Sequence, residues 1–118
     1  MKRISILAVV IALVAFTGKD PITGKWQSPP SVKGTVTTVI YKPDGSFEGF
    51  INKKPFVSGT YSLAGDTVSF VDNGCNGTEA VYKVKFFSNE DSMRFEYIRD
   101  SCVGRKGGME KLVLGKVK

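Results

Sequence analysis

The stretch TEAVYKVKFFSNEDSMRFEYIR, residues 78–99, decides the fold because it contains two alternating runs around the turn-forming segment SNED. Alternation of apolar and polar side chains with period two is typical of strands that bury one face and expose the other. The lysines of the first run share one face, which is therefore predicted to be exposed. The stretch predicts an antiparallel hairpin whose inner face carries Ala80, Tyr82, Val84, Phe86, Met93, Phe95 and Tyr97.

The rest of the chain repeats this pattern. Short runs rich in Val, Ile, Phe, Tyr and Thr alternate with turn residues about every ten positions, which is typical of an all-β sandwich or barrel. No stretch of the sequence carries a convincing helical period. Eight strands are predicted, at residues 23–28, 34–42, 46–52, 55–63, 67–72, 78–87, 92–99 and 110–117.

The connections between these strands fall into two groups. Tight turns are predicted at 43–45, 64–66 and 88–91, and longer loops at 29–33, 73–77 and 100–109. In an up-and-down meander the connections alternate between the two ends, so the tight turns gather at one end and most loops at the other. We therefore predict an all-β fold, an eight-stranded antiparallel up-and-down barrel. At this size inward side chains fill the lumen or leave room for one small ligand. The other inward side chains are predicted to be Phe47, Ile51, Val57, Tyr61, Leu63, Val68, Phe70, Leu112 and Leu114.

The N-terminal segment has the order of a secretory signal. Lys2 and Arg3 precede an apolar run at 4–16, small and polar residues follow it, and the run is short for a bilayer-spanning helix. We expect residues 1–18 to be a signal peptide, with an uncleaved anchor as the alternative, and residues 19–118 to form a single domain. This predicts a periplasmic or secreted protein that meets the membrane only through an uncleaved segment.

The composition excludes several classes of function. The 118 residues include no histidine, which removes Ser-His-Asp and Cys-His catalysis and the commonest ligand of transition metals. Two cysteines without histidine cannot complete a four-ligand zinc site. The net charge of +6 is scattered along the chain, with NKKP at 52–55 as its densest basic spot, so no nucleic-acid partner is expected. We expect a monomer that is not an enzyme and holds neither a metal nor a cofactor.

Several motifs resemble those of a known family. TGKWQ at 23–27, with Gly24 and Trp26, is similar to the Gly-x-Trp start of lipocalins. The segments GTYSLAGDTVSFVDNGC at 59–75, VYKVKF at 81–86, RFEYIRDSC at 94–102 and GR at 104–105 resemble small exported bacterial lipocalin-like proteins. The resemblance covers nearly all of the chain after the signal. It implies a calycin-type barrel in a secreted or periplasmic setting, in a group largely without assigned activity.

Three residues of these motifs are expected to be structural: Gly24, Trp26 and Tyr61. Trp26 is predicted to plug the closed end of the barrel. Larger lipocalins carry a helix after the last strand and an arginine that covers this tryptophan. Here only Lys116 and Lys118 fall in that neighbourhood, and Arg105 belongs to a predicted loop at the opposite end.

Cys75 and Cys102 are predicted to form a disulfide. In an oxidising compartment two cysteines are more often paired than reactive, and neither has a histidine that would make it a catalytic thiolate. They follow the fifth and seventh predicted strands, and a meander brings those two connections to the same end with one strand between them. Glycines around both cysteines allow the two connections to approach each other.

A candidate binding device lies at the mouth of the barrel. Continuing the inward registers of strands 67–72 and 92–99 brings Asp72 and Arg99 to the long-loop end. In one interpretation these two side chains form an ion pair that closes a filled barrel. In the other, Arg99, alone or with Arg105, binds the carboxylate or phosphate of a ligand whose apolar part lies along the three aromatic side chains Tyr82, Phe95 and Tyr97. The candidate set is Asp72, Arg99, Arg105, Tyr82, Phe95 and Tyr97, although for Arg105 a bond to Asp100 or to loop carbonyls is favoured over a ligand.

Two functional hypotheses follow from these observations. The first is a non-enzymatic carrier or sensor that holds a small amphipathic or anionic molecule inside the barrel. The second is an envelope interaction or inhibitor module whose loops contact another protein and whose interior is fully packed. A cavity well above about 300 Å³ favours the first, because ligand pockets begin near that size.

Overall fold

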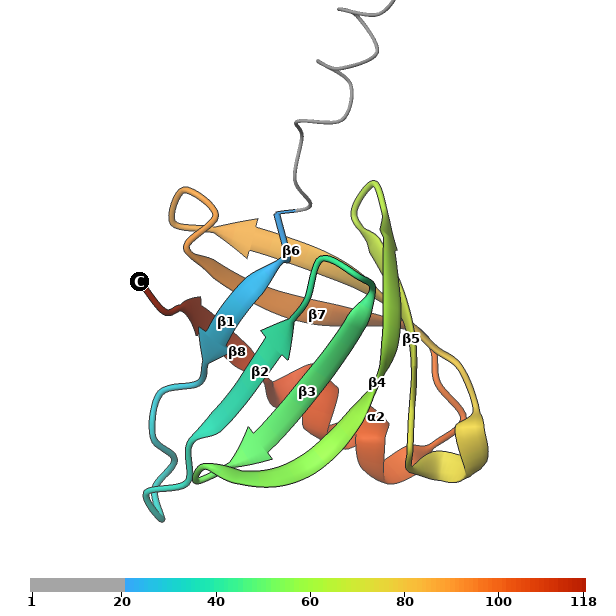
Figure 1. Cartoon of the computed structure of the whole chain (residues 1–118), viewed down its shortest axis with the longest axis horizontal. Coiled ribbons are helices and arrows are strands. Elements are labelled where there is room, and N and C mark those ends of the chain that lie inside the picture. Colours follow the sequence, from blue (N-terminus) through green and yellow to red (C-terminus); the bar gives the residue numbers. More distant parts are fainter. Residues whose placement is uncertain (1–20) are drawn as a thin grey trace, which may run out of the picture.

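The computed structural model describes residues 21–118 and shows a closed barrel of eight antiparallel strands (Figure 1). Each strand pairs with the next along the chain, and β8 pairs with β1 to close the barrel. The predicted eight-stranded up-and-down barrel is therefore confirmed. The strands are β1 (Gly24–Gln27), β2 (Thr37–Tyr41), β3 (Ser46–Ile51), β4 (Lys54–Ala64), β5 (Thr67–Asp72), β6 (Ala80–Phe87), β7 (Ser92–Arg99) and β8 (Val113–Lys116).

The predicted signal peptide, residues 1–18, lies outside the described residues. Within residues 21–118, no helix has the length and the hydropathy needed to cross a membrane. The described part of the chain forms one barrel around one core of buried side chains.

The two ends of the barrel differ as the meander predicts (Figure 1). We call the end with the tight β2–β3, β4–β5 and β6–β7 turns the turn end, which comprises residues 21–24, 42–46, 64–67, 87–92 and 115–118. The opposite loop end comprises residues 28–36, 52–56, 72–79 and 99–112. Its β3–β4 connection is a two-residue turn, in which Asn52 and Lys53 have φ angles of 50° and 71°. Positive φ at both positions is what tight hairpins require, because it matches the twist of the flanking strands.

One prediction about secondary structure is wrong. Residues 103–111 form the helix α2 (Val103–Lys111), where a loop and the start of the last strand were expected. Three of its nine residues are glycines, which disfavour a helix in isolation. The sequence of this segment therefore does not predict a helix. Tertiary contacts stabilise the helix instead: Met109 and Leu112 pack against the barrel core, and Arg105 binds residues of three other segments.

Trp26 is fully buried, as predicted for a plug of the turn end. Its indole Nε1 donates a hydrogen bond to the carbonyl of Ile22 at 2.8 Å, and its ring centroid lies 6.3 Å from that of Phe86. The ammonium Nζ of Lys116 lies 5.6 Å from the centroid of the Trp26 ring, within the range of a cation–π interaction. Buried side chains continue from here along the barrel: Ile22, Val39, Tyr41, Phe47, Tyr61, Val68, Ala80, Tyr82, Val84, Met93, Phe95 and Leu114.

Of the other two residues with expected structural roles, Gly24 belongs to the turn end and Tyr61 of β4 bonds to it. Gly24 has a φ of 132°, in the region that favours glycine. Tyr61 is buried, and its hydroxyl donates a hydrogen bond to the carbonyl of Lys42 at 2.7 Å. This bond ties β4 to the β2–β3 turn and satisfies the polar atom of an otherwise apolar side chain.

The predicted orientation of Arg99 is wrong. The β6–β7 register pairs Val81 with Arg99 and Tyr82 with Tyr97, so Ile98 is an extra residue that forms a bulge. A bulge shifts the alternation by one residue, so the inward position that regular alternation gives to Arg99 passes to Asp100. Tyr97 lies opposite Tyr82 on the same face, with the two ring centroids 6.2 Å apart, and its side chain is 45% exposed. Arg99 is exposed and forms an ion pair with Glu79 instead of Asp72.

Replacing Trp26 with alanine is expected to lower the free energy of unfolding by about 3 to 5 kcal/mol, because it leaves a large cavity at the turn end. Chemical denaturation followed by circular dichroism would measure the change. Phe87→Ala is the matched control, since Phe87 is an exposed aromatic residue at the same end and should change stability by only about 0.5 kcal/mol. Equal effects of the two variants would contradict the assigned role of Trp26.

Candidate ligand-binding cavity

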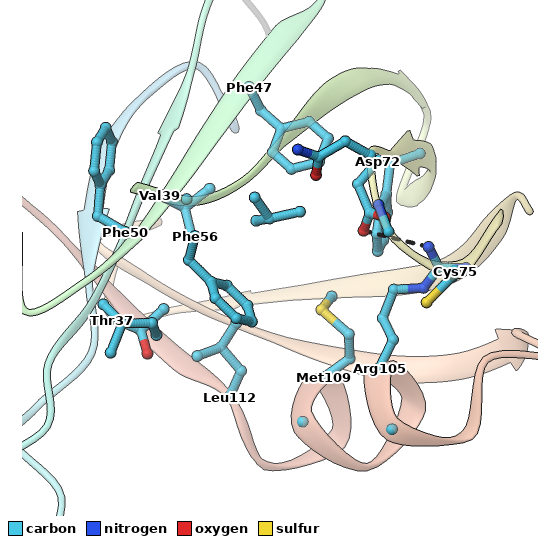
Figure 2. Close-up of a pocket in the computed structure, with 18 of the residues that line it drawn as sticks. Thr37, Val39, Phe47, Phe50, Phe56, Asp72, Cys75, Arg105, Met109 and Leu112 are labelled. Carbon is cyan, nitrogen blue, oxygen red and sulfur yellow. Dashed lines mark hydrogen bonds and ion pairs between the residues drawn. The ribbon is translucent and has the colours of Figure 1, made fainter. Parts of the chain in front are cut away.

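A cavity of about 530 Å³ opens at the loop end of the barrel (Figure 2). Its walls come from β2, β3 and β4 on one side and from α2 on the other, and β5 with the following loop completes it. Most of its lining is apolar or aromatic, with a few polar groups on the β5 side. The lining residues include Thr37, Val39, Tyr41, Phe47, Phe50, Ile51, Phe56, Val57, Phe70, Asp72, Asn73, Cys75, Arg105, Met109 and Leu112.

Phe56 reaches the cavity because of a bulge in β4. Gly49 pairs with Val57 and Phe50 with Pro55, so Phe56 is the extra residue of this strand. Simple alternation directs the side chain before an inward Val57 outward, whereas a bulge can redirect it. Figure 2 shows the Phe56 ring extending toward Leu112, which directly follows α2. The side chain is 71% exposed, so it lies at the opening rather than in the core.

The helix α2 supplies the wall opposite β2–β4. Arg105 and Met109, one turn apart, extend from α2 toward the cavity in Figure 2. Gly104 and Gly108 also line the cavity, and a Cβ added at either position would meet no other atom within 4 Å. The absence of side chains at these two positions leaves space along the exposed edge of the cavity. Larger residues here would narrow it.

Arg105 is held by a network of carboxylates and backbone. Its Nε and Nη2 donate to the Asp100 carboxylate at 2.9–3.2 Å, Nη1 donates to Oδ2 of Asp72 at 3.3 Å, and Nη2 donates to the Thr78 carbonyl at 3.0 Å. The Asp100 carboxylate also accepts hydrogen bonds from the Tyr82 hydroxyl and from the Cys102 backbone N–H. The three charged side chains are almost completely buried. One guanidinium and two carboxylates leave this cluster with a net negative charge.

These contacts shift the pKa values of the cluster. Burial alone would raise the pKa of Asp100, but hydrogen bonds from Arg105, Tyr82 and the Cys102 N–H outweigh it and lower that pKa below its usual value. Hydrogen bonds to Asp100 raise the pKa of the Arg105 guanidinium. Burial, followed by the bond to Asp100, raises the pKa of the Tyr82 hydroxyl. At neutral pH the tyrosine is therefore a neutral donor and the ion pair is fully charged.

The disulfide prediction is confirmed. Cys75 and Cys102 are bonded, with their Cα atoms 5.8 Å apart. Cys75 lies in the short 3-10 helix η1 (Cys75–Gly77) and lines the cavity, while Cys102 directly precedes α2. The bond therefore fixes the start of α2 to the loop after β5. Like Arg105, it holds the helix against the mouth of the barrel, and it indicates a non-cytoplasmic environment.

The structure brings together only part of the predicted binding set. Asp72 and Arg105 line the cavity, and Arg105 binds Asp100 and a loop carbonyl, as favoured by the sequence. Tyr82 and Phe95 are buried in the barrel core and do not line this cavity. Tyr97 lies outside it, with the Lys106 ammonium 4.5 Å from its ring centroid. With Arg99 directed outward, the wall of the cavity is formed by β2–β4 and α2 rather than by β6 and β7.

Sequence reasoning did not assign Phe56, Met109 or the α2 glycines to the site. A bulge can be recognised in a sequence only where it breaks the alternation of apolar and polar residues. Phe56 and Val57 are both apolar, so no such break is visible here. The α2 glycines favour a loop by propensity, so their position along a helix could not be read from the sequence. Phe47, Val57 and Leu112 were predicted to point inward, and all three line the cavity.

Comparisons with family models, with curated proteins and with solved structures found no match to this chain. Among residues 21–118, no group of three or more acidic or cysteine side chains is placed to hold a metal ion. Function is therefore inferred from the geometry of the cavity and from the residues that line it.

Replacing Arg105 with lysine is expected to lower the free energy of unfolding by about 2 to 4 kcal/mol, although the charge is kept. A single ammonium cannot reach Asp100, Asp72 and the Thr78 carbonyl together, so a buried carboxylate loses its partner. Arg94→Lys is the matched control, because Arg94 is exposed and its pair with Glu96 should contribute about 1 kcal/mol or less. Equal denaturation midpoints for the two variants would refute the role of Arg105.

Removing the disulfide by Cys75→Ser with Cys102→Ser is expected to destabilise the protein by about 3 to 4 kcal/mol, since the bond closes a loop with a sequence separation of 27. Amide hydrogen exchange should increase most in α2 and in residues 73–79, while β2 and β3 stay protected. Uniform exchange across the barrel would show that the bond does not act locally on α2.

Proposed function

We propose that this protein is a non-enzymatic binder of a small, largely apolar molecule, which it holds in the cavity between β2–β4 and α2. The observation that carries the proposal is the cavity volume of about 530 Å³, combined with an apolar and aromatic lining. Small-molecule sites in proteins have volumes of about 300 to 1,000 Å³ and such a lining. A fully packed barrel, which the interaction-module hypothesis assumes, would not leave this space.

The charges of the site favour a ligand with a neutral or hydrogen-bond-donating head over an anion. Arg105 already binds two carboxylates, so its charge is compensated within the protein. The cluster as a whole is negative, and Asp72 lines the cavity as a hydrogen-bond acceptor. A hydroxyl or amine on the ligand would find an acceptor here, whereas a carboxylate would meet like charge. The anionic ligand considered from the sequence is therefore the less favoured form.

We further propose that the chain is an exported, lipocalin-like protein of the periplasm or the extracellular space. The closed eight-stranded barrel, the motifs around Trp26 and Tyr61, and the disulfide support this proposal. The leader-like composition of residues 1–18 supports it independently. A binder of this kind would carry or sense an apolar molecule outside the cytoplasm.

A neutral naphthylamine dye that fluoresces in apolar surroundings tests the binding proposal. The dye should bind saturably, and long-chain alcohols should displace it more effectively than the fatty acids of the same length. Gly108→Leu should weaken dye binding by about tenfold or more, because its side chain would occupy space along the cavity edge.

Gly107→Leu is the matched control. Gly107 lies on the same helix with equally open surroundings but does not line the cavity, so leucine at either position alters helix propensity equally. The apolar run at 4–16 is the same in all of these proteins and cannot cause a difference between them. Equal loss of binding in both variants, or no saturable binding in the wild type, would refute the proposal.

A further inference from the structure

Three apolar side chains protrude from separate segments of the loop end. Val32 is fully exposed in the β1–β2 loop, Phe56 projects at the β3–β4 hairpin, and Val103 is 83% exposed at the start of α2. A hydrogen bond from Gly34 N–H to the Ser31 carbonyl places Val32 at the tip of a turn. Figure 1 shows these three segments at the same end of the barrel. The cavity opens at this same end, and Phe56 lines it.

Positive charge accompanies these side chains. The loop end carries seven cationic side chains and four carboxylates. All four carboxylates are engaged in ion pairs, two with Arg105, one with Arg99 and one with Lys106. Within the described part of the chain, four lysines of this end form no ion pair. They are Lys33, Lys53, Lys54 and Lys111.

The turn end has the opposite character. Its segments carry three lysines and four carboxylates, so the charge of the described barrel is polarised along its axis. Lys33 adjoins Val32 in sequence, and Lys53 and Lys54 adjoin the Phe56 tip. Val32 and Phe56 are thus flanked by cations that face solvent. At the turn end Val117 also lies between two lysines, but Lys118 forms an ion pair with Asp91 and carboxylates outnumber lysines there.

We propose that the loop end docks on a bilayer that contains anionic phospholipids. Lysines near such a surface are attracted by its negative potential, and the apolar tips between them can enter the boundary between headgroups and acyl chains. A membrane fits better than an acidic protein because the apolar side chains stand on separate tips rather than in one continuous patch. The cavity opens at the same end of the barrel, so docking would present its mouth to a phase that holds apolar molecules.

This proposal goes beyond binding of a ligand, and apart from Phe56 it depends on different residues. Val32, Val103, Lys33 and Lys54 do not line the cavity. Variants at these positions should therefore keep their affinity for the naphthylamine dye in the absence of vesicles. Failure of dye binding and failure of membrane docking can in this way be told apart.

Flotation with vesicles tests the docking surface. The wild-type chain should bind vesicles of phosphatidylcholine with phosphatidylglycerol more tightly than vesicles of phosphatidylcholine alone, and added salt should reduce the difference. Lys33→Gln with Lys54→Gln should weaken binding to the anionic vesicles by about twentyfold, given the attraction of each lysine to the surface. Val32→Ser with Val103→Ser should weaken it by about tenfold or more.

Two matched controls remove the same charge, or an exposed apolar side chain, from parts of the barrel outside the loop end. Lys25→Gln with Lys85→Gln removes the same charge from β1 and β6, and Phe87→Ser removes an exposed aromatic side chain from the turn end. Both controls should bind anionic vesicles like the wild type. Equal losses in controls and loop-end variants, or no preference of the wild type for anionic vesicles, would overturn the proposal. The run at 4–16 is unchanged throughout, so any difference reports on the loop end.

Discussion

The arrangement of the loop end depends on the guanidinium of Arg105. This one group binds Asp100 directly after β7, Asp72 at the end of β5 and the Thr78 carbonyl before β6. The backbone of Arg105 itself belongs to α2. It thereby joins three barrel strands to a helix that is poor in intrinsic helix formers. Two buried carboxylates would be costly without a cation, and a buried cation would be costly without them, so the network forms as a unit. The disulfide fixes the same helix at its first turn and adds a covalent constraint to the electrostatic one.

Two bulges determine which side chains face the cavity. The bulge at Ile98 moves Asp100 into the interior and Arg99 out of it, which gives Arg105 its principal partner. The bulge at Phe56 brings an aromatic ring to the opening that regular alternation would turn toward solvent. In both cases one added residue moves the neighbouring side chains of the strand to the opposite face, because side chains alternate between the two faces with a period of two. The mouth is thus built by departures from regular pairing, whereas the turn end follows it.

The cavity and the charge distribution lie at the same end of the molecule. The α2 glycines that leave the cavity open also reduce the cover that the helix provides, and the opening lies at the end that carries the exposed apolar tips and the lysines without ion pairs. An apolar ligand would enter through this end, and the negative Asp72–Arg105–Asp100 cluster would select against an anionic head inside. The lysines outside the cavity would then attract an anionic surface, while the negative cluster inside it would discriminate between ligands.

The sequence alone determined the barrel, the inward set at the turn end and the disulfide. Period-two alternation and tight turns are local properties, and a meander converts them into strand order, so Trp26, Tyr61 and the Cys75–Cys102 pair could be placed from the residues. The helix α2, the two bulges and the cavity were decided by tertiary structure. Three glycines in nine residues specify no helix, and the helix forms because Arg105, Met109 and Leu112 gain partners in the barrel. A bulge depends on the register between two strands rather than on either one, and a cavity depends on how side chains from distant segments fill one volume.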